Sequence, residues 1–152
     1  MPTVRPVTRR ALLLASSLAL GGCGFVSFQR PRTDQELILR GQVRYFYSQI
    51  QLAFAEGNPD ALTVLFSPSI TRPMSYAEVQ AWARRFFSEN KTARFRILRL
   101  EIEQLGPVQA VVLLTYKVQT PDGKGDFGGT ERDTLSQSGG RWSIVAWDKV
   151  AP

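Results

Sequence analysis

Acidic side chains occur within otherwise apolar strand patterns of this sequence, where they could support proton transfer. Because side chains alternate along a strand, Glu131 and Asp133 fall on the same face as Leu135. The same alternation puts Asp148 on the face of Ile144. Burial raises the pKa of a carboxyl group, and a carboxylate with a raised pKa can act as a general base near neutral pH. These three residues are therefore candidates for acid–base chemistry.

Two tyrosines could complete such a site. Tyr116 is in phase with Val112 and Leu114, and Tyr45 borders an apolar helical stripe earlier in the chain. A tyrosine hydroxyl can donate a hydrogen bond that polarises a carbonyl group of a bound molecule. The alternative is that these strands extend beyond the core, so that the carboxylates lie in water and pair with neighbouring arginines.

The composition excludes several kinds of catalytic site. The 152 residues include no histidine and a single cysteine, Cys23. A Ser-His-Asp triad, a Cys-His pair and a histidine zinc site are therefore excluded. The glycines after residue 120 lack the spacing of a nucleotide-binding loop. We expect neither a metal nor a cofactor.

The amino-terminal residues have the pattern of a secretory signal. Arg5, Arg9 and Arg10 precede an apolar run over residues 11–20, and small residues follow it. Ten residues form about 15 Å of helix, whereas about 20 apolar residues are needed to cross the hydrocarbon core of a bilayer. We therefore expect residues 1–22 to be a signal peptide that is removed.

The junction LGGC, from Leu20 to Cys23, resembles the lipobox of bacterial lipoproteins. In that family the cysteine receives a diacylglycerol, and the chain is cut before it. The resemblance implies lipidation at Cys23, a lipidated tether over residues 23–33, and a place in the bacterial cell envelope facing the periplasm. Gly24 in place of an aspartate favours the outer membrane, by analogy with the bacterial sorting rule. The alternatives are an ordinary signal peptide with an incidental cysteine, and an uncleaved anchor.

A cluster of arginines lies on one face of a predicted strand. Arg94, Arg96 and Arg99 face away from Phe95, and acidic residues follow them on the same face. Anionic lipid head groups or an acidic protein are the candidate partners, and a solvated sheet face is the alternative. Nucleic acid is not expected as a partner of an exported lipoprotein. Three of the nineteen basic residues lie in the signal segment, and the remaining sixteen nearly balance the thirteen acidic residues.

Three helices are predicted in the first half of the remaining chain. Thr33 begins a capping box for a helix that ends near Glu56, and Pro59 suits the first turn of a short second helix. Ser75 and Glu78 form the capping box of a third helix. Apolar residues recur at spacings of three and four in the two longer helices: Leu39, Val43, Phe46, Ile50, Ala53 and Phe54, then Val79, Trp82, Ala83, Phe86 and Phe87.

From Lys91 onwards the apolar period changes to two, which predicts four strands in an antiparallel meander. The first strand changes phase between Ile97 and Leu98, and a β-bulge there would keep both on the apolar face. Residues 120–126 form a turn-rich hairpin loop. A very short additional strand is also considered near Ile70. The element order predicts an α+β fold, with three helices packed on a curved antiparallel sheet of four or five strands.

Two segments of this domain resemble the nuclear transport factor 2-like superfamily, which includes ketosteroid isomerase. AFAEGNPDAL, from Ala53 to Leu62, is similar to its first helix junction, and GGRWSIVAWDKV, from Gly139 to Val150, is similar to its final strand. The resemblance covers about residues 34–150 and implies a cystatin-like cone. It also implies a pocket between the concave face of the sheet and the first and third helices, and dimerisation through the sheet is common in that superfamily.

Two classes of function follow from these observations. The first, which the sequence favours, is a membrane-anchored envelope lipoprotein that binds a small apolar ligand or an envelope protein without catalysis. The second is a small isomerase, cyclase or hydratase that uses a carboxylate and a tyrosine in the pocket. A carboxylate buried beside a tyrosine in an apolar cavity would favour the enzyme, whereas exposed carboxylates and a filled cone would favour the binding module.

Overall fold

Helices precede a single antiparallel sheet in the computed structural model, which describes residues 33–151. The helices are α1 (Asp34–Glu56), α2 (Pro59–Thr63) and α3 (Tyr76–Glu89). The strands are β1 (Arg94–Leu105), β2 (Gln109–Gln119), β3 (Phe127–Ser138) and β4 (Arg141–Val150), and they pair in the order β1-β2-β3-β4. This arrangement confirms the predicted α+β fold, with a sheet of four strands.

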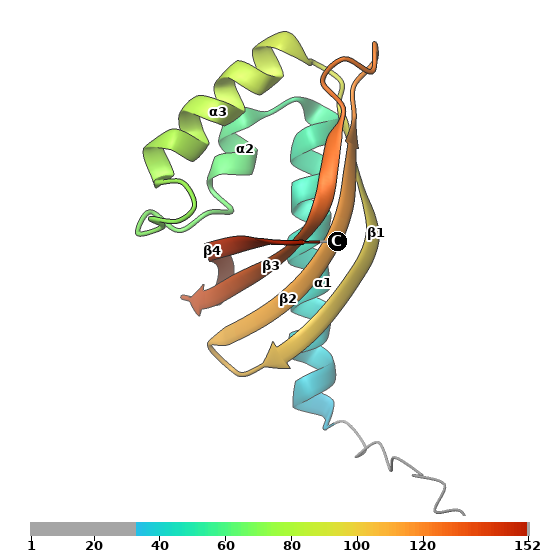
Figure 1. Cartoon of the computed structure of the whole chain (residues 1–152). Coiled ribbons are helices and arrows are strands. Elements are labelled where there is room, and N and C mark those ends of the chain that lie inside the picture. The colour runs from blue at the N-terminus through green and yellow to red at the C-terminus, as the bar shows by residue number, and fades with distance from the viewer. Residues whose placement is uncertain (1–32, 152) are drawn as a thin grey trace, which may run out of the picture. The chain divides into compact units, whose positions relative to one another are not determined.

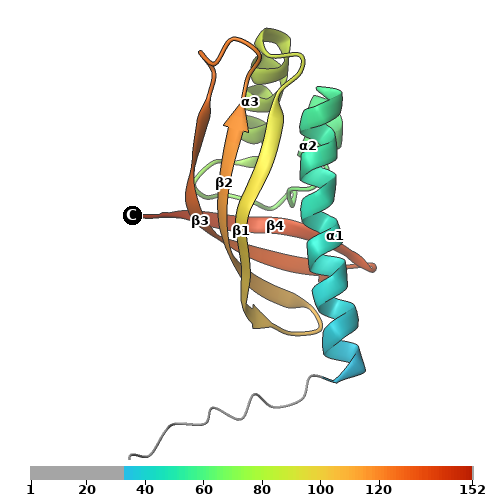
Figure 2. The ribbon, with the colours of Figure 1, turned by 90° about the vertical axis from the view of Figure 1, so that its right-hand side faces the viewer.

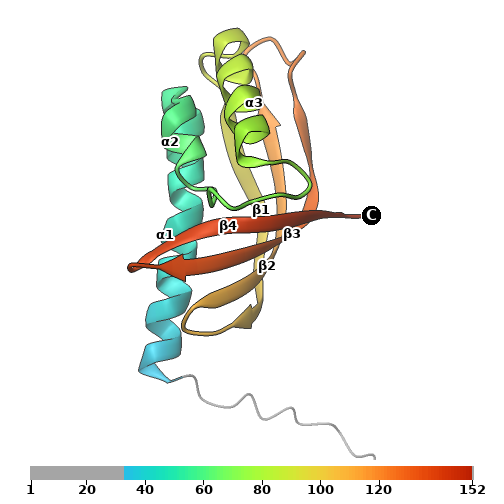
Figure 3. The same cartoon turned by 90° about the vertical axis from the view of Figure 1, so that its left-hand side faces the viewer.

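The sheet is strongly curved around the helices. Its concave side faces α2 and α3 (Figure 1), and α1 runs beside β1 along the sheet (Figure 2). Seen from the other side, β3 and β4 turn across the direction of α1 and pass below α3 (Figure 3). The concave face of the sheet and the helices therefore enclose the interior of this domain.

The helix boundaries follow from the capping residues. The hydroxyl of Thr33 accepts a hydrogen bond from the amide of Glu36, at 3.2 Å. Ser75 and Glu78 form a reciprocal capping box: the serine hydroxyl accepts from the glutamate amide, and the glutamate carboxylate accepts from the serine amide. Gly57 ends α1 in the left-handed conformation, with φ of 62°, which glycine adopts without strain. The predicted helix starts are confirmed.

The predicted β-bulge in β1 is present, but its effect on Leu98 is not the expected one. The pairing with β2 shifts between Ile97 and Arg99, so that Leu98 is the extra residue. An extra residue leaves the ladder, and the side chain of Leu98 is 60 % exposed. The prediction that Leu98 joins the apolar face is therefore wrong, and that face continues from Ile97 to Leu100.

The core lies between α1, α3 and the concave face of the sheet. Its most completely buried large side chains come from α1, the α2–α3 region and the central strands: Val43, Tyr47, Leu62, Ile70, Val112, Leu114, Val118, Asp133 and Leu135. Ile70 is buried but belongs to no strand, and the nearby β-bridge instead pairs Phe66 with Ile144. The very short strand considered near Ile70 therefore does not form within residues 33–151.

The predicted signal peptide over residues 1–22, Cys23 and residues 24–32 of the predicted tether lie outside the described residues, whereas Thr33, the last residue of that tether, is the N-cap of α1. Their roles stay predictions. Among the helices that the structure describes, none is long and apolar enough to cross a membrane.

Candidate functional site

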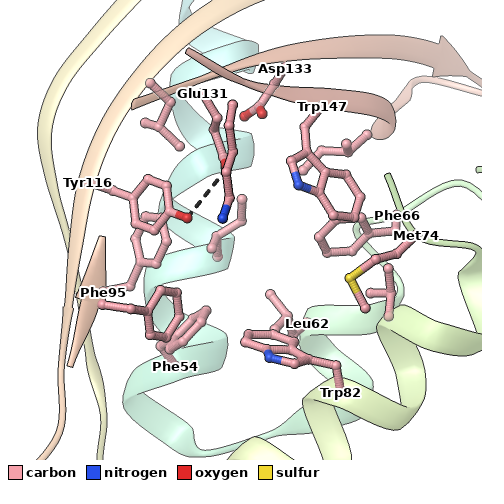
Figure 4. Close-up of a pocket in the computed structure, with 16 residues that line it drawn as sticks. Phe54, Leu62, Phe66, Met74, Trp82, Phe95, Tyr116, Glu131, Asp133 and Trp147 are labelled. Atoms are coloured by element: carbon pink, nitrogen blue, oxygen red, sulfur yellow. Dashed lines mark hydrogen bonds between the residues drawn. The ribbon is translucent and has the colours of Figure 1, made fainter. Parts of the chain in front are cut away.

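A cavity of about 250 Å³ opens between the helices and the concave face of the sheet. Its wall is mostly apolar and rich in aromatic rings, and Figure 4 shows Tyr116, Glu131 and Asp133 within this wall. The apolar lining is contributed by α1, α2, α3, the loop segments beside them, and all four strands: Ile50, Phe54, Leu62, Phe66, Met74, Val79, Trp82, Phe95, Leu114, Phe127, Ile144 and Trp147. Small sites of this kind bind ligands mainly through apolar contact, with a few polar groups that fix orientation.

Asp133 is the most deeply buried polar group of the cavity. It lies on β3 and has no solvent exposure. The hydroxyl of Tyr47, which is also fully buried on α1, donates a hydrogen bond of 2.6 Å to its Oδ2. Oδ1 of Asp133 is buried and has no hydrogen-bond partner among the described residues. A buried acceptor without a partner is costly, so this atom needs an explanation such as a bound group or a catalytic role.

Glu131 lies two residues before Asp133 on the same face of β3. Side chains spaced in this way are about 7 Å apart along a strand. The hydroxyl of Tyr116 donates a long hydrogen bond of 3.4 Å to Glu131. Lys149 lines the cavity and is the cross-strand partner of Glu131 on β4. The cavity therefore carries two carboxyl groups, each with a tyrosine donor, and one exposed lysine at its edge.

Burial shifts the pKa values of this cluster upwards. Desolvation raises the pKa of Asp133 to about 7, although the hydrogen bond from Tyr47 opposes the shift. Desolvation and the charge of Asp133 raise the pKa of Glu131 to about 8, against the effects of Tyr116 and Lys149. The pair therefore retains a proton at neutral pH. Burial also raises the pKa of both tyrosines, so their hydroxyls stay protonated and can donate.

Asp148 does not belong to this cluster. It is exposed on the opposite face of β4, where it pairs across the strands with Arg132. The register between β3 and β4 shifts, since Leu135 pairs with Ile144 but Thr134 pairs with Ala146. The extra residue on β4 reverses the alternation beyond Ile144. The prediction that Asp148 faces inward is therefore wrong.

Tyr45 was also predicted to border the pocket, but its side chain is 67 % exposed and does not line the cavity. The tyrosine of α1 that contacts the site is Tyr47, which is not among the predicted site residues. Tyr47 lies four residues after Val43 and three before Ile50, and both of those residues are buried. Helical spacing could therefore have identified it.

The three arginines of the basic cluster lie on the outer face of β1, as expected. Arg94, Arg96 and Arg99 are exposed. Arg99 forms an ion pair with Glu101, and Arg96 donates to the side chain of Gln119 at 3.5 Å. The ion pair reduces the positive charge of this face, and a partner for it stays a prediction.

The polar groups of the cavity are suited to moving protons. One protonated carboxyl group could donate a proton while the neighbouring carboxylate accepts one. No group of three or more potential metal ligands occurs within the described part of the chain.

Comparison with known proteins identifies the fold. No protein-family model and no curated protein matches this chain. Among solved structures, Bd1075 of Bdellovibrio bacteriovorus is similar with a TM-score of 0.63 at 12 % identity. The match covers 73 % of this chain and only 40 % of that protein.

Two further structures are similar over most of their own length. A candidate dehydratase of the NTF2-like family from Streptomyces avermitilis has a TM-score of 0.57 at 13 % identity, covering 76 % of this chain and 99 % of that one. A Nostoc punctiforme domain of unknown function with a cystatin-like fold has a TM-score of 0.56 at 15 % identity, covering 72 % and 75 %. Identities this low bear on the fold alone. The described domain therefore has the cystatin-like α+β fold that nuclear transport factor 2-like proteins share.

Proposed function

We propose that this domain is a small enzyme of the hydratase or isomerase type that acts on a mainly apolar molecule. The observation that carries the proposal is the pair Glu131 and Asp133, which lies in an aromatic-lined cavity with a tyrosine donor on each carboxyl group. The likeness to a candidate dehydratase supports it at the level of the fold. This reverses the preference drawn from sequence, because Asp133 is buried, Glu131 is half-buried, and the cone is not filled.

The environments of the two carboxyl groups suggest their tasks. The short hydrogen bond from Tyr47 favours the ionised form of Asp133, which would remove a proton from a carbon next to a carbonyl group. Glu131, protonated, would deliver its proton to a leaving hydroxyl group, so that the C–O bond breaks and water departs. Asp133 has then gained one proton and Glu131 has lost one, and a proton transfer between them restores the pair. In an isomerisation, the abstracted proton would instead return to a different carbon.

A ligand-binding role without catalysis is the second candidate. It is favoured by Oδ1 of Asp133, a buried acceptor that a hydroxyl or N–H group of a ligand would satisfy. In this case the protein would bind the same class of molecule, but the carboxyl pair would only orient it.

Deuterium exchange on a model ketone separates the two candidates. 2-Tetralone has an apolar bicyclic body and exchangeable protons beside its carbonyl group, and its binding is read from the fluorescence of Trp82 and Trp147, which line the cavity. We expect the chain to accelerate exchange in D₂O, measured by proton NMR. Asp133→Asn, which removes the assigned base, should reduce the acceleration about 100-fold or more. Asp148→Asn, an exposed aspartate on β4, serves as the matched control.

Binding without acceleration would favour the non-catalytic candidate. Equal acceleration by the wild type and Asp133→Asn would contradict the assignment of Asp133 as the base.

We further propose that the domain is held at the bacterial envelope through a lipid on Cys23, with the outer membrane favoured. The support is the order of basic residues, apolar run and LGGC junction in the sequence. Mass spectrometry of the chain from a membrane fraction tests this. The mature protein should begin at Cys23 and carry acyl mass, and a different amino terminus or an unmodified cysteine would contradict the proposal.

A further inference from the structure

The outer face of α1 carries large apolar side chains that nothing in the described domain covers. Ile38, Tyr45 and Leu52 are 61 %, 67 % and 48 % exposed, and they recur every seven residues. Seven residues are two helical turns, so these side chains form one straight stripe opposite the buried face of α1.

Small residues alternate with the large ones along this stripe. Gly41, Ser48 and Ala55 are exposed and also recur every seven residues, midway between the large side chains. We call the six residues from Ile38 to Ala55 the α1 seam. It contains no charged residue, and the Ser48 hydroxyl donates back to the carbonyl of Tyr45 within the helix, at 2.6 Å. The α1 seam is therefore uncharged over about 26 Å of helix.

No contact within a single copy of the domain requires a glycine at position 41. A Cβ atom at this position would meet nothing within 4 Å. Glycine in the middle of an exposed helix reduces helix stability relative to alanine, because it loses more backbone freedom. A position that is costly in one copy and offers unused space is typical of close approach by another backbone.

We propose that the α1 seam is a two-fold interface at which α1 packs antiparallel against α1 of a second copy of this chain. At a two-fold interface the same surface of both copies is in contact, so a residue that faces a second residue of the partner is itself faced by that second residue's counterpart. A two-fold axis midway between Tyr45 and Ser48 pairs each of these with the other in the partner. The same axis pairs Ile38 with the partner's Ala55, and Leu52 with the partner's Gly41. One register thus matches a large with a small residue at every layer, which identifies a second copy as the occupant.

The interface is small, which determines how it must be tested. About 26 Å of helix seam, about 10 Å wide, buries far less than the roughly 800 Å² per partner of a standard interface. The hairpin between β3 and β4 borders the seam, since Gln137 and Trp142 both donate to Gln42 of α1. Because the buried area is small, the dimer is weak in dilute solution. Cross-linking, which traps a weak dimer covalently, is therefore the appropriate measurement.

Cross-linking tests the interface in the full chain carrying Cys23→Ser, so that the introduced thiol is the only one. Ser48→Cys should give a covalent dimer with a short bismaleimide. The matched control Val64→Cys should not, because Val64 is 68 % exposed but lies outside the seam. Adding Gly41→Arg, which meets open space in a single copy, should reduce the Ser48→Cys product about tenfold. The proposed interface would be overturned if Ser48→Cys gave no more covalent dimer than Val64→Cys, or if Gly41→Arg left the yield from Ser48→Cys unchanged.

A residue exchange tests the two-fold register separately. Ser48→Tyr alone places two tyrosines opposite each other and should shift the full chain to monomer in sedimentation equilibrium, at a protein concentration high enough to populate the weak dimer of the wild type. The double variant Tyr45→Ser with Ser48→Tyr restores one large and one small residue per layer, so the dimer should return. A double variant no more dimeric than Ser48→Tyr would overturn the register. These outcomes do not depend on what the cavity binds.

Discussion

Replacing Asp133 with asparagine should make the stability of this protein less dependent on pH. In the folded chain the pKa of Asp133 is raised to about 7, so the folded state holds this proton more tightly than the unfolded state. The resulting stabilisation is complete below about pH 4 and is lost as the pH rises through 7. Between pH 5 and pH 8.5 the loss from this one group is about 3 kcal/mol. Asparagine cannot ionise, and its side-chain oxygen can still accept from Tyr47.

Urea denaturation at pH 5 and pH 8.5, at one ionic strength, measures this difference. The free energy of unfolding of Asp133→Asn minus that of the wild type should be about 3 kcal/mol larger at pH 8.5 than at pH 5, because only the wild type loses stability as the pH rises. Any fixed cost of the substitution is present at both pH values and cancels. Asp148→Asn, at an exposed position, should behave as the wild type does. A difference between Asp133→Asn and the wild type that is the same at both pH values would refute a raised pKa at Asp133.

Three further substitutions test the supports of the site and the fold, each by urea denaturation. Tyr47→Phe removes the hydrogen-bond donor to Asp133. The free energy of unfolding should fall by about 1.5–3 kcal/mol at pH 8.5, where Asp133 is charged, and by about 1 kcal/mol at pH 5, where it is neutral. Equal losses at both pH values would contradict a change in the charge of Asp133 between them. Ser75→Ala should cost about 1 kcal/mol because α3 loses its N-cap, and no loss would show that the cap is dispensable. Gly57→Ala should lower the free energy of unfolding by more than about 1 kcal/mol, because the added Cβ would lie 2.5 Å from the Lys91 carbonyl oxygen and φ is positive at this position. An unchanged free energy of unfolding would contradict this close approach.

Strand alternation correctly predicted that Glu131 and Asp133 share the inner face of the sheet, because β3 has no extra residue in this part of the strand. The chain from Glu131 to Leu135 alternates without an extra residue, so Glu131 and Asp133 share the face of the buried Leu135, and both line the cavity. The same reasoning failed for Asp148 because the extra residue of the β3–β4 register shift lies on β4. A bulge depends on how two strands pair, which the pattern of one strand does not reveal.

The helical period of α1 carries two further signals. The stripe through Val43, Phe46 and Ile50 also includes Tyr47, whereas Tyr45 points to the opposite side of α1. The alternation of large and small residues over 38–55 was likewise present in the sequence. Its meaning required knowledge of which face of α1 is buried. The volume of the cavity could not be predicted, because it is what remains unfilled after α3 and the sheet have packed.

Titration of the carboxyl pair tests the central claim most directly. Carbon-13 NMR of the side-chain carboxyl groups, assigned by comparison with Asp133→Asn and Glu131→Gln, follows the ionisation of each group as the pH is varied. We predict that the pair titrates in two steps, near pH 7 and pH 8. Two carboxyl groups that both titrate below pH 5 would contradict a proton-holding pair in the cavity.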